Sequence, residues 1–405
     1  MTSPELKLRA INLSAEVATP FYLFDLNRVF QAYRELQDAW RNRFPRAVIA
    51  YSFKTNPLPA ITKRLATLGA GAEVVSGTEL EWAELDGFSP ERIFFDGPVK
   101  RREELETAAR LGARIQIDSA DEARLLAAVC RESGHRPGVA CRLAVPYENR
   151  ISRFGMSPEE FSVAQDILEK DRIPLSGLHF HLGSNLNSPA EYARAVNRCL
   201  PSLVPLLERH GRRAWLDIGG GFSANSAFDG VQCTPDQEFV DSIWIALRNG
   251  GITPDTLRVV VEPGRRLVED HCLLVSRVAV RKQRGETRVL VLDAGTNLAR
   301  SVGTWHHPIE FARKTTPSAS VRYDLYGALC FESDRFASGV SAPCDVAVGE
   351  VVLIGSVGGY DMANASVWTR PRPPVLGLID GKVRTLRRRE TGAEMRQLES
   401  TEAIA

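Results

Sequence analysis

The stretch that decides the fold is AVIAYSFKTN, residues 47–56, an apolar run that ends in a lysine and a polar turn. The run from Ala47 to Phe53 has the composition of a buried β-strand, and a helical pattern follows it. Lys54 is therefore expected at the carboxyl end of a strand. A lysine in that position is usually a solvated charge, but it can also be a covalent catalyst, and the stretch alone leaves both interpretations open.

Alternation of short apolar runs with longer helical segments continues along more than half of the chain. Eight such alternating units predict a parallel sheet closed into a (β/α)8 barrel, and an open doubly wound sheet is the alternative. The eight runs are Val48–Phe53, Ala72–Val75, Ile93–Phe95, Arg114–Ile117, Gly138–Leu143, Leu175–Phe180, Ala214–Ile218 and Leu257–Val261.

The chain becomes β-rich after about Arg277, with apolar runs separated by turn residues. Asp380-Gly381 lies between two such runs and predicts a hairpin. The predicted fold class is therefore α/β, a (β/α)8 barrel followed by a C-terminal β domain.

Composition limits the possible partners of this 405-residue chain. A net charge of +1 gives no general reason to expect nucleic acid or an anionic membrane as a partner. The N-terminal residues lack a signal-peptide pattern and no apolar stretch reaches bilayer-spanning length, so we expect a cytoplasmic protein. The seven cysteines are scattered and form no CxxC pair, which argues against a disulfide framework and against a structural zinc site.

Several motifs follow the predicted strands or lie in the β-rich part. Three glycines after a strand let backbone N–H groups approach an anion, although a tight turn is the simpler interpretation. His179 and His181 would point to one face of a strand, where core histidines are the default, and no third metal ligand is evident. The motifs are HFHLGS at 179–184, DIGGGF at 217–222, EPGR at 262–265, the lone Cys330 and GGY at 358–360.

In order and spacing, these motifs resemble the pyridoxal-phosphate decarboxylases of fold type III, the ornithine and diaminopimelate decarboxylase family with an alanine-racemase-like barrel. The resemblance extends from about Thr19 to Arg388. It implies a cofactor-binding barrel at residues 25–276 and a β-rich domain, 1–24 and 277–405, that completes the active site. It also implies pyridoxal 5′-phosphate as cofactor, with these binding residues: Lys54, Glu73, His181, Ser184, Gly219, Gly220, Gly221, Glu262, Arg265 and Tyr360.

The resemblance assigns catalytic roles as well. Lys54 would form the aldimine with the cofactor, whose ring acts as an electron sink. Glu262 would keep the ring nitrogen protonated, although a helix cap or an ion pair with a neighbouring arginine is the plainer interpretation of that residue. Cys330 would return a proton to Cα after carbon dioxide leaves. Because the cysteine loop of the family reaches into the partner's site, the resemblance implies a homodimer with shared active sites.

One position departs from the family pattern. Ornithine and diaminopimelate decarboxylases have an acidic residue directly after the cysteine, where this chain has Phe331, while Asp334 matches a family aspartate. Arg300, with His306 and His307, lies in a segment that resembles the part meeting the far end of the substrate. We therefore hypothesise an amino acid with a carboxylated or acylated distal group, as in the siderophore and antibiotic branches of the family. Packing of Phe331 in a dimer interface is the competing interpretation.

Other functions remain as alternatives. The first is a decarboxylase of free amino acids of the diaminopimelate, ornithine or lysine type. An amino-acid racemase is disfavoured by Glu262, because related racemases resemble the case with an arginine beside the ring nitrogen. A catalytically inactive regulatory homologue is disfavoured because Lys54, Cys330 and the glycine run are all present.

Overall fold

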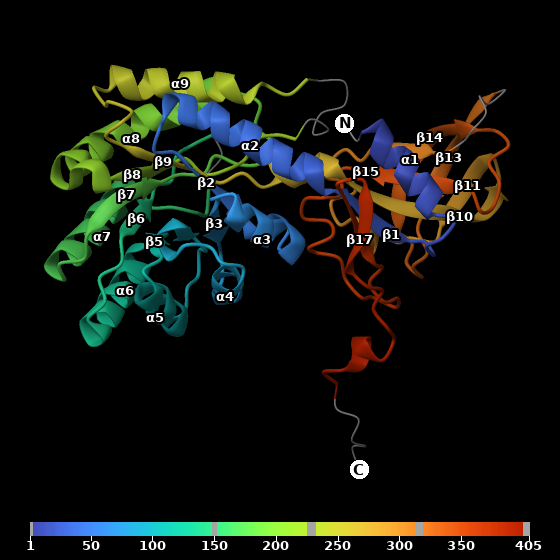
Figure 1. Cartoon of the computed structure of the whole chain (residues 1–405), viewed down its shortest axis with the longest axis horizontal. Coiled ribbons are helices and arrows are strands. Elements are labelled where there is room, and N and C mark those ends of the chain that lie inside the picture. Colours follow the sequence, from blue (N-terminus) through green and yellow to red (C-terminus); the bar gives the residue numbers. More distant parts are fainter. Residues whose placement is uncertain (1–2, 148–151, 225–231, 313–318, 400–405) are drawn as a thin grey trace, which may run out of the picture. The chain divides into compact units, whose positions relative to one another are not determined.

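The computed structural model describes residues 3–147, 152–224, 232–312 and 319–399, and these fall into two compact units. The barrel unit comprises Phe30–Ala224 and Gln232–Leu267. The β unit contains the described residues up to Val29 and from Val268 onward. Figure 1 labels the elements of both units, which are described separately below.

Eight parallel strands close the barrel, and each pairs with the next along the chain. β2 also pairs with β9, which confirms the predicted barrel and excludes the open sheet. The strands are β2 Val48–Ser52, β3 Gly71–Val74, β4 Ile93–Phe95, β5 Arg114–Ile117, β6 Val139–Arg142, β7 Leu175–His179, β8 Trp215–Asp217 and β9 Arg258–Val261.

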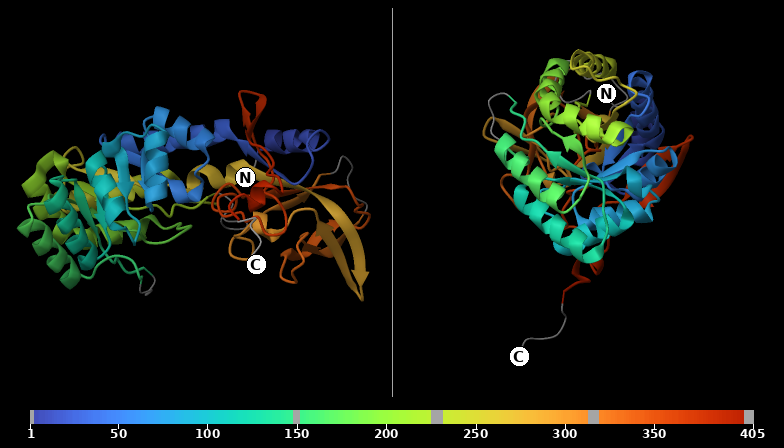
Figure 2. Two further views of the ribbon diagram at one scale, coloured as in Figure 1. Left: turned by 90° about the horizontal axis from the view of Figure 1, so that it is seen from below. Right: turned by 90° about the vertical axis from the view of Figure 1, so that its left-hand side faces the viewer.

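Helices surround these strands, as the right-hand view of Figure 2 shows. α6 illustrates why they form: the Ser119 side chain accepts a hydrogen bond from the Glu122 amide at its start, and Gly134, with a φ of 76°, ends it. Its buried face includes Ala123 and Leu126. The helices are α2 Leu26–Arg43, α3 Pro59–Thr67, α4 Gly77–Leu85, α5 Arg102–Leu111, α6 Ala120–Ser133, α7 Pro158–Lys170, α8 Pro189–His210, α9 Asp236–Asn249 and the short α10 Arg265–Val268.

The β unit is built on a nine-stranded sheet that includes the N-terminal strand. β1 lies between β10, to which it is antiparallel, and β16, to which it is parallel. Helix α1, Pro4–Leu13, contributes Leu6, Ala10 and Leu13 to the apolar core of this sheet. The strands are β1 Phe21–Asp25, β10 Cys272–Arg284, β11 Thr287–Leu292, β12 Ile309–Phe311, β13 Ser320–Tyr326, β14 Arg335–Pro343, β15 Val351–Gly355, β16 Val375–Ile379 and β17 Lys382–Arg387.

The predicted hairpin is confirmed. β16 and β17 pair antiparallel up to Ile379 and Lys382, and Asp380 and Gly381 between them both have positive φ. This is the backbone that a two-residue hairpin turn requires.

Two further expectations concern the whole chain. All seven cysteines are free, and five of them are buried. Within the part of the chain that the structure describes, no helix has the length and apolarity needed to cross a bilayer.

Candidate active site

Polar side chains gather at the carboxyl ends of the barrel strands. Lys54 lies in the single 3-10 turn, Phe53–Thr55, that follows β2, and Glu73 lies on the neighbouring β3. His179 is the last residue of β7, and Glu262 directly follows β9. Because the carboxyl ends of parallel strands meet at one rim, these four side chains form one site although they lie far apart in the sequence.

Lys54 is paired with a buried carboxylate. Its Nζ makes an ion pair with Oε1 of Glu73, which is fully buried. The register of β2 and β3 places Ser52 opposite Glu73 and so brings the lysine to this partner. Lys54 is thus not the solvated surface charge that its sequence position allowed.

The glycine run after β8 is a tight turn whose amides are used inside the protein. The Gly219 amide donates to Asp217 Oδ1 at 2.9 Å, and the Gly220 amide donates to His181 Nδ1 at 3.2 Å. The carbonyl of Gly221 accepts the Leu186 amide at 2.7 Å, which ties the turn to the loop that carries exposed Ser184. Two of the three amides therefore orient neighbouring residues, and the approach of this turn to an anion stays a prediction.

Substituting Gly220 by alanine should destabilise the barrel unit. A Cβ there would lie 2.1 Å from the Glu262 carbonyl oxygen, and backbone atoms cannot yield as a flexible side chain would. We expect a loss of about 2–4 kcal/mol in the free energy of unfolding, measured by urea denaturation. Gly392→Ala, where a Cβ meets nothing within 4 Å, is the control and should be near neutral. Equal stability of both variants would show that the turn can relax.

The two histidines are neutral near pH 7. Burial, followed by the charge of Arg142, lowers the pKa of His179 to about 4 and that of His181 to about 3. Since Nδ1 of His181 accepts the Gly220 amide, its proton is on Nε2. His181 can therefore present an uncharged, oriented ring to a planar ligand.

Glu262 is one of several rim acids, Glu73 and Asp217 among them, whose pKa is raised. It is buried; its Oε2 lies 3.7 Å from His179 Nε2, and its Oε1 has no hydrogen-bond partner among the described residues. Burial, followed by the charge of Asp96, raises the pKa of Glu262 to about 8. Arg266, one of the two arginines that could pair with Glu262, pairs instead with Asp236.

Glu262 should make the stability of the cofactor-free protein fall as pH rises. Its pKa is raised above the unfolded value, so the folded state holds the extra proton between about pH 4.5 and 8. In Glu262→Gln this titration is absent. The free energy of unfolding of the variant relative to wild type should therefore increase by up to about 1.4 kcal/mol per pH unit across that window.

Urea denaturation at several pH values within the window measures this difference. Glu84→Gln, at an exposed position of α4, is the control and should show a difference that does not change with pH. A flat profile for Glu262→Gln would mean that Glu262 ionises normally in the folded protein.

Sequence reasoning missed three residues of this cluster. Asp96 directly follows β4, Arg142 ends β6 and Asp217 ends β8. Asp217 accepts Gln116 Nε2 at 2.6 Å, and Arg142 Nη1 lies 3.9 Å from Asp96 Oδ2. The signal was present, because each is a charged residue at a strand end on the same rim.

Three potential metal ligands lie close together at the rim of the barrel. Ligand atoms of Asp96, His179 and Glu262 lie within 4.8 Å of one another, so two carboxylates accompany the histidine for which no third ligand was evident. The lack of a third ligand, which the sequence suggested, therefore does not hold for His179.

The remaining predicted residues lie in the β unit. Cys330 is exposed, and it lies with Phe331 along a pocket of about 810 Å³. Buried Asp334 shapes this loop: it accepts the Thr296 amide and hydroxyl at 2.7 and 2.8 Å, and the Leu329 amide at 2.7 Å. Asp334 is therefore a structural residue of the cysteine loop.

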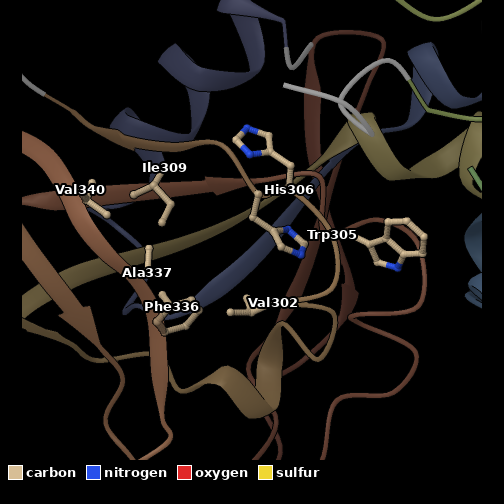
Figure 3. A pocket seen from close by; sticks show the side chains of 9 residues that line it. Val302, Trp305, His306, Ile309, Phe336, Ala337 and Val340 are labelled. Carbon is tan, nitrogen blue, oxygen red and sulfur yellow. The ribbon is translucent and has the colours of Figure 1, made fainter. Parts of the chain in front are cut away.

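Three predicted residues near Arg300 differ in their environments. Arg300 and His306 are exposed, whereas His307 Nε2 contacts Ser301 Oγ at 2.9 Å and its Nδ1 contacts the Gly355 carbonyl at 3.0 Å. Both nitrogens of His307 are thus engaged within the β unit, which favours a structural role. Figure 3 shows Val302, Ile309, Phe336 and Val340 beside His306 around a pocket of about 320 Å³. Tyr360 is half-buried, with a φ of 67°.

The barrel site fits pyridoxal phosphate. It offers one lysine amine, a neutral histidine ring and a buried carboxyl whose Oε1 lacks a partner among the described residues. A planar ring with one basic nitrogen would satisfy that carboxyl. Arg265, buried three residues after Glu262 in the chain, adds a cation for a phosphate group.

Comparisons with known proteins agree. Residues 31–269 match the family model for the pyridoxal-dependent decarboxylase, pyridoxal binding domain. Diaminopimelate decarboxylase of Methanothermobacter thermautotrophicus is 30% identical and covers 95% of this chain and 92% of its own length. That of Deinococcus radiodurans is 32% identical over 92% of this chain and 93% of its own length.

Solved structures are similar across both units. Diaminopimelate decarboxylase of Helicobacter pylori complexed with L-lysine matches with a TM-score of 0.86 and 26% identity, covering 96% of this chain and 98% of that chain. The enzyme of M. jannaschii in complex with L-lysine gives a TM-score of 0.88 at 25% identity, covering 97% of this chain and 94% of that one. The chain belongs to the fold type III pyridoxal-dependent decarboxylases and is a carboxy-lyase that uses pyridoxal phosphate.

Proposed function

We propose that the substrate is a free diamino acid of the diaminopimelate type. The observation that carries this proposal is the similarity to diaminopimelate decarboxylases over more than nine-tenths of the chain. It favours a free amino acid over the conjugated substrate that the departure at Phe331 suggested.

Pyridoxal phosphate, when bound, supplies an electron sink that makes loss of the carboxyl group from Cα possible. Lys54 anchors the cofactor through its amine, and Glu73 holds that amine in place through the ion pair. The neutral ring of His181 packs against a planar ligand, with its tautomer fixed by Gly220. Glu262 holds a proton at the ring nitrogen, and Cys330 supplies the proton that Cα needs afterwards.

Recognition of the distal group depends on the β unit. Exposed Arg300 provides a planar pair of donors for a distal carboxylate. Asp334 is not available to a distal ammonium, because it binds Thr296 and Leu329. Glu332, two residues after Cys330, is exposed and is the acid that we propose for binding the distal ammonium.

A conjugated substrate is the second candidate, and one observation favours it. The rings of Phe331 and Trp368 pack edge to face with centroids 5.3 Å apart, yet 49% and 48% of these side chains are exposed. An exposed aromatic pair next to Cys330 offers apolar surface on which an acyl group could pack.

Mass spectrometry of reactions in heavy water tests the proposal. The loaded enzyme is given diaminopimelate, lysine, ornithine, and citryl or glutamyl conjugates, and carbon dioxide loss and Cα deuteration are followed together. We expect carbon dioxide loss from diaminopimelate with the highest kcat/KM. Faster loss from a conjugate would favour the second candidate, and deuteration without loss would indicate a racemase.

Arg300→Gln should separate recognition of the distal carboxylate from chemistry. We expect kcat/KM for diaminopimelate to fall by about 10²-fold, since the variant lacks the charge-assisted contact to the distal carboxylate of the substrate. Any turnover of lysine, which lacks the distal carboxylate, should change little. Arg288→Gln, at an exposed position of β11, is the control. Equal losses on both substrates would exclude Arg300 as the carboxylate ligand.

We also infer a homodimer in which the exposed Cys330 loop serves the partner's barrel. The seven free cysteines support our expectation of a reducing, cytoplasmic setting.

A further inference from the structure

The barrel rim holds more buried acids than cations. If all four were ionised, two cations could not balance them, and unbalanced buried charge is strongly unfavourable. The cluster must therefore retain protons near pH 7. The acids, with their exposed fractions, are Glu73 (0%), Asp96 (5%), Asp217 (0%) and Glu262 (4%), and the cations are Lys54 and Arg142.

The contacts indicate where negative charge is held. Lys54 pairs with Glu73, and Arg142 Nη1 lies 3.9 Å from Asp96 Oδ2. Asp217 accepts neutral donors from Gln116 and Gly219. Glu262 Oε2 faces Nε2 of the neutral His179 ring at 3.7 Å, a partner that carries no positive charge to stabilise a carboxylate.

Asp96 and Glu262 face the same histidine. Asp96 Oδ2 lies 4.0 Å from His179 Nε2, the atom that Glu262 also approaches. Because both acids are buried, an anion on Asp96 raises the cost of a second anion on Glu262.

The pKa directions single out Asp96, because burial raises the pKa of Glu73 and of Asp217 well above the usual range. Burial opposes ionisation of Asp96, but the charges of Lys54 and neighbouring groups hold its pKa well below the usual range. Burial, followed by Asp96, raises the pKa of Glu262 to about 8. At neutral pH Asp96 is ionised and Glu262 carries a proton.

We propose that Asp96 is a positioning residue for the cofactor: with Lys54 and Arg142 as its nearby cations, it takes the negative charge of the cluster and leaves on Glu262 the proton that the cofactor's ring nitrogen needs. The inference concerns the ring nitrogen and does not depend on which amino acid is decarboxylated. The charged and titratable groups around Glu262, strand by strand, are Lys54 after β2, Glu73 on β3, Asp96 after β4, Asp118 after β5, Arg142 on β6, His179 and His181 at β7, and Asp217 on β8.

Binding of two cofactors to the cofactor-free protein tests this role without measuring activity. One is pyridoxal phosphate, and the other is its analogue with a carbon in place of the ring nitrogen. We expect wild type to prefer pyridoxal phosphate by about tenfold or more, since one proton contact distinguishes the two. Asp96→Asn keeps the shape of the side chain and removes its charge. In this variant the ratio of the two dissociation constants should decrease several-fold.

A pH profile gives an independent measure. Loss of the Asp96 charge lowers the pKa of Glu262, so the alkaline limb of kcat in Asp96→Asn should move to lower pH by about one unit. Asp118→Asn is the matched control: Asp118 Oδ1 lies 3.7 Å from Arg142 Nε and accepts the Gly155 amide, and Asp118 is not among the groups that shift the pKa of Glu262. It should leave both the cofactor preference and the alkaline limb unchanged.

Several outcomes would overturn the proposal. Equal weakening of both cofactors in Asp96→Asn would mean that Asp96 is only structural. If Glu262→Gln still prefers pyridoxal phosphate over the analogue as wild type does, Glu262 is not the partner of the ring nitrogen, and the role of Asp96 is excluded as well. One equivalent of bound metal in wild type, absent from Asp96→Asn, would assign the carboxylates to a cation. If Asp96→Asn does not fold, Asp96→Glu must retain the preference and Asp96→Ser must reduce it.

Discussion

Replacing Lys54 by alanine should lower the rate of decarboxylation by roughly 10⁴-fold or more, because the variant loses its covalent attachment to the cofactor. Lys54 follows β2 directly, and its amine reaches the buried Glu73. No other lysine of the described barrel residues shares this position, since Lys100 is enclosed by Glu122 and two backbone carbonyls. The readouts are carbon dioxide release and mass spectrometry after borohydride reduction, which should find the cofactor on Lys54 in wild type and on no residue in the variant.

Lys63→Ala is the matched control for this substitution. Lys63 lies on α3, nine residues further along the chain, and its side chain is mostly exposed. It should keep full activity and the cofactor on Lys54. Retention of more than a few per cent of the rate in Lys54→Ala, or attachment at another lysine, would reject the role of Lys54.

Much of this molecule could be predicted from its sequence. The eight apolar runs became the eight barrel strands because a parallel barrel buries its strands on both faces and makes their runs continuously apolar. The hairpin at Asp380 and Gly381 followed from the positive φ that such a turn demands. Lys54, His181 and Glu262 were found because strand ends of a barrel converge.

The rest depended on contacts between residues far apart in the sequence. That Asp96 shares His179 with Glu262 follows from strand register, which local patterns do not contain. The glycine run predicted a close approach to an anion, but its pattern did not show that two of its amides bind Asp217 and His181. The sequence context of His307 suggested a substrate ligand, yet both of its ring nitrogens contact groups of the β unit, Ser301 Oγ and the Gly355 carbonyl.

Substrate preference is the least predictable property, because it depends on one or two side chains of a loop. Phe331 departs from the family pattern and pointed to a conjugate, whereas similarity along nearly the whole chain favours a free diamino acid. Overall similarity reports the scaffold and the chemistry of the cofactor, while a single exposed side chain can change the distal pocket.

Cys330→Ala should lower kcat by about 10²–10⁴-fold, the range expected for loss of a positioned proton donor. Cys330 is exposed, and the loop that carries it is fixed by the Asp334 contacts to Thr296 and Leu329. Binding of the cofactor should be unchanged, because Cys330 acts only on Cα. Cys344→Ala, a partly exposed thiol of the same unit, is the control and should keep full activity.

Mixing inactive variants tests whether Cys330 acts in the partner's site. Lys54→Ala and Cys330→Ala protomers, mixed in equal amounts and allowed to exchange, should recover about a quarter of wild-type activity if each site combines a lysine and a cysteine from different subunits. Half of the dimers are then mixed, and one of their two sites carries both intact residues. If both groups came from one subunit, no mixture of these two variants could build an intact site, and activity would stay at the level of the separate variants.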